Sequence, residues 1–143
     1  MYAAYDSANI FAKILRNELP CIKLFEDDAT IAIMDIMPQA DGHVLVIPKE
    51  AAVGLLDLSP EAASAAIRTV QKLAKAVRDA LQPAGLFIAQ ANGAPAGQTI
   101  PHCHFHIIPN ETGKPFRPHA VERADDALLR DYASKIIAAL EKQ

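Results

Sequence analysis

Residues 101–109 read PHCHFHIIP and place a histidine at every second position. No other feature narrows the possible structures of this chain as far. The segment is rich in aromatic and β-branched residues, which predicts a β-strand. Because successive side chains of a strand point to opposite faces, we expect His102, His104 and His106 to share one face. The apolar residues between them then face a core. The strand therefore belongs to a sheet that carries a row of histidines on its other face.

The remaining hydrophobic patterns predict an antiparallel α+β fold. The strand over 100–108 is joined by four others, over 22–26, 30–35, 43–48 and 86–91. A short first helix follows a possible Ser7 cap, and a last helix covers about 124–140. The clearest helix begins after Ser59, which we expect as its N-cap, with Pro60 in the first helical position, and it runs to Leu81.

Length and charge exclude several classes of protein. A chain of 143 residues suits one domain, 1–143, with a real core. Its 14 basic and 17 acidic residues give a net charge of -3 without a basic block, so we expect no nucleic-acid partner. Cys21 and Cys103 are the only cysteines, which fits a reducing cytoplasm. We also expect no signal peptide and no membrane association.

Three imidazoles on one strand face need a chemical reason. Neighbours about 6.7 Å apart would repel by roughly 2.5 kcal/mol if both were charged, so we expect coupled titration with mixed charge states. Such a set offers a neutral nucleophile beside cationic donors, which suits a phosphate ester. Three alternating histidines can equally bind zinc. Gly93 and Gly97 lie in the loop that enters the histidine strand, where backbone amides can approach an anion closely. They therefore favour chemistry on a phosphate ester over zinc binding.

Several segments together resemble the histidine triad (HIT) superfamily, and within it the Hint branch and its bacterial relatives. The resemblance extends from NIFAKILRNELPC through EDD, MDIMPQADGHVLVIPK and NGAPAGQ to HFHIIP, with the central motif standing as HCHFHII. It implies a five-stranded antiparallel sheet with one long central helix and short terminal helices. The family core then covers about 8–110, and residues 111–143 form a C-terminal extension.

The resemblance also implies roles for the histidines. His104 corresponds to the nucleophile that attacks the α-phosphate of a nucleotide and forms a nucleotidyl-histidine intermediate, which water later hydrolyses. His106 corresponds to the ring that contacts non-bridging phosphate oxygens, and His102 to the ring beside the leaving group. His43 matches a fourth family histidine next to the triad.

The remaining site residues come from the same resemblance. Asp35 corresponds to the carboxylate that holds the ribose hydroxyls, and Ile36 to a wall of the base pocket. The phosphate-site loop is represented by Asn92, Gly97, Gln98 and Thr99. The implied chemistry needs no metal or other cofactor. The usual positions of a structural zinc read Asn9, Ala12 and Ala51, so we expect no such site.

The sequence therefore predicts a homodimeric purine-nucleotide hydrolase that cleaves a P–N or P–O bond at the α-phosphate of a nucleoside monophosphate conjugate. Phosphoramidates of adenosine or guanosine are the expected substrates. A dinucleoside polyphosphate hydrolase, a nucleotide-binding regulatory module with little turnover and a metal-binding protein stay open as alternatives. In the extension, Lys114, Arg117 and His119 could reach a substrate, but we expect a solvated loop there.

Overall fold

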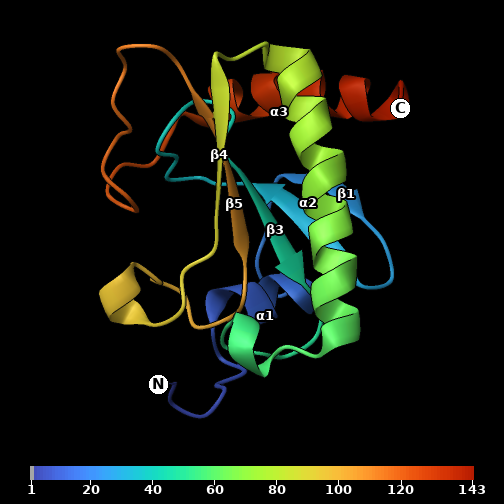
Figure 1. Cartoon of the computed structure of the whole chain (residues 1–143), viewed down its shortest axis with the longest axis vertical. Helices are drawn as coiled ribbons and strands as arrows, with labels where there is room; N and C mark the ends of the chain where they lie inside the picture. Colours follow the sequence, from blue (N-terminus) through green and yellow to red (C-terminus); the bar gives the residue numbers. More distant parts are fainter. Residues whose placement is uncertain (1) are drawn as a thin grey trace.

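The computed structural model describes residues 2–143 and confirms the α+β fold with its five-stranded antiparallel sheet (Figure 1). The strands are β1 (Lys23–Glu26), β2 (Thr30–Met34), β3 (Val44–Pro48), β4 (Gly85–Ala89) and β5 (Phe105–Asn110). Their order across the sheet is β1-β2-β3-β5-β4, and each neighbouring pair is antiparallel. The sheet thus places β5, which ends the histidine segment, beside the central strand β3.

Three α-helices are present in residues 2–143: α1 (Ile10–Leu15), α2 (Pro60–Leu81) and α3 (Asp126–Glu141). Ser59 caps α2 as predicted, because its side chain accepts the Ala62 N–H. The predicted Ser7 cap of α1 is wrong: Asn9 caps that helix, and its Oδ1 accepts the Ala12 N–H at 2.9 Å. None of the described helices is both long and apolar enough to cross a membrane.

Both faces of the sheet are covered. Ala32 and Met34 of β2 point to the side of α2 and α3, whereas Ile31 and Ile33 point to the side of α1. β3 alternates in the same way, which explains why every residue of β2 and β3 is buried although their side chains point in opposite directions. The extension expected over 111–143 ends in α3, which packs on α2 (Figure 1).

The histidine segment is less regular than its alternation predicts. β5 begins only at Phe105, so His102 and His104 precede the strand that was expected over 100–108. Pro101 has no N–H for a ladder, and the Cys103 N–H donates to the Ala52 carbonyl outside the sheet. Cys103, Phe105 and Ile107 nevertheless lie in the α2-side core, as predicted.

Candidate active site

A cavity of about 340 Å³ opens on the α1 side of the sheet. This volume suits a small organic ligand with a few placed polar groups. Its apolar wall comes mainly from α1, β2 and β3 and includes Ile10, Phe11, Ile14, Ile33, Ile36 and Leu45. Its polar lining consists of Asp35, Thr99, His104, His106 and His119.

His104 presents an unprotonated nitrogen. Its Nδ1 lies 2.7 Å from the His102 carbonyl oxygen, and because a carbonyl can only accept, Nδ1 carries the ring proton and donates it. Nε2 therefore holds a lone pair. The ring packs edge-on against Phe11 with centroids 4.9 Å apart, which fixes its orientation. His104 is thus a neutral, oriented nucleophile that lines the cavity.

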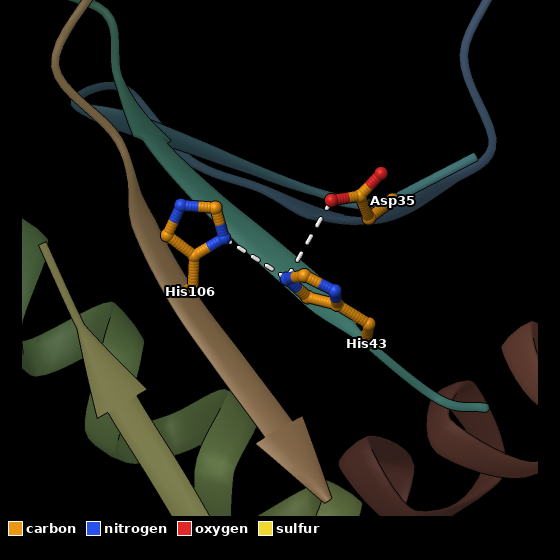
Figure 2. Close-up of side chains that lie close together, drawn as sticks. All are labelled: Asp35, His43 and His106. Carbon is orange, nitrogen blue, oxygen red and sulfur yellow. Dashed lines mark hydrogen bonds and ion pairs between the residues drawn. The ribbon is translucent and has the colours of Figure 1, made fainter. Parts of the chain in front are cut away.

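His43 and His106 form a hydrogen-bonded pair whose tautomers are also fixed by the backbone. The Gln39 N–H donates to His43 Nδ1 at 3.1 Å, so the proton of His43 is on Nε2. That Nε2–H donates to His106 Nδ1 at 2.9 Å (Figure 2). His106 must then carry its own proton on Nε2. The centroids of the His104 and His106 rings are 5.0 Å apart. His106 therefore has an N–H available for a ligand next to the nucleophile.

His102 is a supporting residue in this structure. It is fully buried, its Nε2–H donates to the Pro48 carbonyl at 2.8 Å, and its Nδ1 accepts the Tyr5 hydroxyl at 2.6 Å. Both ring nitrogens are occupied, and the residue does not line the cavity. The position beside the leaving group, which the resemblance implies for His102, stays a prediction. In the structure His102 orients His104 through its carbonyl.

Burial keeps the rings neutral. Together with a smaller effect of neighbouring histidines, it lowers the pKa of His43 and of His106 to about 3 and that of His104 to about 4. Burial also lowers the pKa of His102. The expectation of cationic donors beside the nucleophile is therefore wrong for the unliganded protein, because desolvation outweighs the benefit of charge. The donors are neutral N–H groups.

Asp35 and Ile36 lie in the cavity at the end of β2. One carboxylate oxygen of Asp35 accepts the Met37 N–H at 2.8 Å, and the other lies 3.5 Å from His43 Nε2 (Figure 2). Burial raises the pKa of Asp35, while its hydrogen bond to Met37 opposes the rise. Ile36 is partly exposed, so an apolar ligand group can cover it.

The loop over 92–99 contributes less directly than predicted. The N–H groups of Gly93, Gly97 and Gln98 are all used inside the loop, since Gly93 donates to Gln98 Oε1, and Gly97 and Gln98 donate to backbone carbonyls. Asn92 accepts the Leu55 N–H and the Tyr2 hydroxyl. Among the predicted loop residues, Thr99 alone lines the cavity in the described chain. The other three hold the loop that carries it.

Comparison with known proteins agrees with this geometry. The HIT domain family matches residues 16–113. The chain belongs to that family. It is 40% identical over 134 residues to the adenosine 5'-monophosphoramidase hnt1 of Schizosaccharomyces pombe, covering 89% of this chain and 97% of that protein. A Hit-like protein involved in cell-cycle regulation from Bartonella henselae, crystallised with an unknown ligand, is 47% identical with a TM-score of 0.89, over 96% of this chain and 99% of that one.

The segment between the part of the chain that matches the HIT domain and α3 is irregular and mostly exposed, in agreement with the predicted solvated loop. His119 is one of its partly buried residues and contacts the site. Its Nε2 is 3.2 Å from Thr99 Oγ1, and its ring centroid is 5.5 Å from that of His106. Arg117 is also engaged, because it forms an ion pair with Asp41 at 2.8 Å. No periodicity marks this segment, so the only sequence signal was the presence of an imidazole near the triad.

A metal site must also be considered in this HIT domain. A zinc-bound histidine triad family protein from Mycobacterium smegmatis is 32% identical with a TM-score of 0.82, covering 94% of each chain. In the present chain, Asp35, His43 and His106 bring possible ligand atoms within 4.8 Å of one another. However, the proton of His43 lies on the nitrogen that faces the other two groups. The donor set is therefore arranged for a hydrogen bond, and a metal ion does not fit unless His43 changes tautomer.

Proposed function

We propose that this HIT domain protein hydrolyses conjugates of purine nucleoside monophosphates at the α-phosphate, through a nucleotidyl-His104 intermediate. The observation that carries the proposal is the unprotonated Nε2 of His104, which lines the cavity while the His102 carbonyl holds Nδ1–H at 2.7 Å. A neutral imidazole next to an N–H donor can attack phosphorus while the donor binds a phosphate oxygen.

The other residues receive roles that the resemblance implies and that their contacts support. His106 donates Nε2–H to a non-bridging oxygen, and His43 fixes the His106 tautomer. Asp35 binds the ribose hydroxyls, and Ile36 covers the base. Thr99 contacts the phosphate, while Asn92, Gly97 and Gln98 maintain its loop. We assign His102 a positioning role, since both of its nitrogens are occupied.

The similarity to a yeast phosphoramidase supports a P–N bond as the scissile bond. The fission yeast relative is named an adenosine 5'-monophosphoramidase and aligns with most of this chain. We therefore propose phosphoramidates of adenosine as the first substrates to test. The same geometry accepts a P–O conjugate, because the attack by His104 does not depend on the leaving atom.

We further propose that the reaction needs no metal ion or other cofactor. Phosphoryl transfer requires stabilisation of charge on the phosphate oxygens, which a divalent cation supplies in many enzymes. In this proposal the N–H of His106 and the hydroxyl of Thr99 supply that stabilisation, and the tautomer of His43, which disfavours a metal ion beside them, supports it.

We also propose a homodimer. β4 forms one edge of the sheet, and Phe87 and Ile88 on it are 51% and 47% exposed. Ile67 on the neighbouring α2 is 53% exposed and forms an apolar hollow together with Ile88. An unpaired, apolar strand edge favours pairing with a second copy.

The free thiols of Cys21 and Cys103 fit the cytoplasm, which we propose as the location.

The decisive experiment measures hydrolysis of a fluorogenic adenosine phosphoramidate in the presence of EDTA. We expect the wild type to turn over and His104→Ala to lose detectable activity, with rapid-quench detection of an adenylylated wild-type protein. Activity that disappears with EDTA would contradict the metal-free chemistry. Full activity in His104→Ala would contradict the assigned nucleophile.

A further inference from the structure

The core histidines do not account for the proton that an amine leaving group needs. The ring protons of His43, His102 and His104 are each donated to a fixed partner. His106 is also neutral, and a neutral imidazole that gave up its only proton would become an anion. P–N cleavage releases an amine, and expelling it without protonation is unfavourable. The acid must therefore come from another residue.

His119 lies close enough to the nucleophile to supply this proton. It lines the same cavity as His104 and His106, and the centroids of the three rings follow one another at 5.0 and 5.5 Å. The three rings therefore border one space, and a phosphate group that contacts His104 and His106 would share it with His119. The ring is only partly buried, so it exchanges protons with solvent more readily than the core histidines.

The hydrogen bonds of His119 are satisfied in both protonation states. Its Nδ1 lies 3.3 Å from Gln39 Oε1, an amide oxygen that accepts a hydrogen bond from Nδ1–H in either state. Its Nε2 lies 3.2 Å from the Thr99 hydroxyl, which can donate to a neutral ring or accept from an imidazolium. A ring with such partners gains or loses the Nε2 proton without leaving a polar atom unpaired, which is what an acid and base group needs.

The charged and titratable groups around His119 come from several elements. Asp35 faces it across the cavity, and although burial raises the pKa of Asp35, a positive charge on His119 lowers that pKa again. The titratable groups on the other side are His43, His104 and His106, which burial keeps neutral. Arg117 of the same segment is paired with Asp41.

The backbone holds His119 in this position. The Arg117 N–H donates to the Gln39 carbonyl at 2.7 Å, and the Ala124 N–H donates to the Ile36 carbonyl at 2.8 Å. These two bonds fasten the segment over 117–124 to the loop between β2 and β3. In Figure 1 this segment is the orange connection that leaves β5 and returns to α3. His119 is thus fixed over the cavity, although it lies in an irregular segment.

The geometry points to His119 as the general acid that protonates the leaving group and the general base that activates water in the second half of the reaction. This inference rests on the nucleotidyl transfer proposed above. In the first step, His104 Nε2 forms a bond to phosphorus, the bond from phosphorus to the amine breaks, and the amine nitrogen takes the Nε2 proton of the His119 imidazolium. In the second step, water forms the new P–O bond, the bond to His104 breaks, and neutral His119 takes the proton of water.

The test compares two substrates in the wild type and in His119→Gln. One is an alkylamine phosphoramidate of AMP, whose leaving group needs a proton. The other is the p-nitrophenyl ester of AMP, whose leaving group departs as a stable anion.

Glutamine at position 119 keeps an amide that can reach Thr99 but cannot transfer a proton. We expect kcat for formation of the nucleotidyl intermediate from the phosphoramidate to fall roughly a hundredfold or more, and the corresponding rate for the ester to change by less than about threefold. Lys114→Gln, in the same segment, serves as the matched control and should change neither rate.

Equal losses on both substrates would show a structural role and overturn the inference, as would an unchanged rate on the phosphoramidate. A wild type that cleaves neither substrate would contradict the proposed function itself. A wild type that cleaves both, with a variant defective in neither, would contradict only the role of His119.

Discussion

Acidification is expected to destabilise this protein strongly because its active site buries neutral imidazoles. The folded pKa values of His43 and His106 are about 3 and that of His104 is about 4, whereas the ordinary value is 6.5. Below pH 6.5 the unfolded chain binds protons at these positions and the folded chain does not. The free energy of unfolding is therefore highest above about pH 6.5 and falls as the pH drops to about 3, the folded pKa of His43 and His106.

The magnitude follows from proton counting. At pH 5.5 each of the three rings holds about 0.9 proton more in the unfolded chain, so unfolding takes up roughly 2.7 protons. The free energy of unfolding should then change by roughly 3.7 kcal/mol per pH unit near pH 5.5. Between pH 7.5 and 5.0 the loss is about 2 kcal/mol per ring, or about 6 kcal/mol in all. This is a large share of the total of about 5–15 kcal/mol that is typical of a domain.

Urea unfolding followed by far-ultraviolet circular dichroism, at several values between pH 7.5 and 5.0, measures this slope directly. His106→Gln is the matched control, since the glutamine oxygen can still accept the His43 Nε2–H while one titrating ring is removed. We expect the slope of the variant to be about one third smaller. A wild-type slope below about 1.4 kcal/mol per pH unit at pH 5.5, equivalent to a single proton, would refute the reasoning.

Three further substitutions test other parts of the structure. Tyr5→Phe removes the donor to His102 Nδ1 and leaves a buried acceptor unpaired, so we expect a loss of about 1–3 kcal/mol in urea unfolding, and an unchanged stability would argue against that bond. Gly42→Ala places a Cβ 2.4 Å from Leu81 Cδ1 at a φ of +89°. We expect it to cost about 2–4 kcal/mol, measured in the same way, and a cost below about 1 kcal/mol would contradict the close approach. Ile88→Asp should convert the proposed dimer into monomers in light scattering after size-exclusion chromatography, and a monomeric wild type would contradict the dimer.

Features fixed by local chemistry were predictable from the sequence. The Ser59 cap of α2 and the alternation that puts Cys103, Phe105 and Ile107 in the core depend on neighbouring residues, and the structure confirms both. The bounds of the strands differ by a few residues where non-local bonds decide. The clearest case is the histidine segment, where the Cys103 N–H bonds to the Ala52 carbonyl and removes His102 and His104 from the ladder.

The sequence predicted which histidines and which carboxylate form the site. It did not predict where their protons lie or that His119 lines the same cavity. No pattern in the sequence indicates that Gln39 sets the tautomer of His43, because that contact depends on the path of the β2–β3 loop. Likewise, His119 reaches the cavity only because Arg117 is bonded to that same loop. Cationic donors were expected from the distances between histidines along a strand, but burial proved the larger effect.

The proton positions of the four core rings depend almost entirely on main-chain atoms: the N–H of residue 39 and the carbonyls of residues 48 and 102. A backbone atom remains when its side chain is replaced. Provided that the loop keeps its course, residue 48 can therefore change identity, and residue 39 can become any residue that keeps its N–H, without changing the tautomers of His43, His102 and His106. Replacing Gln39 would remove only the side chain that contacts His119. The protonation pattern of these histidines thus depends on the path of the backbone. Side chains of the pocket wall can therefore be exchanged in a design for a new substrate without altering that pattern.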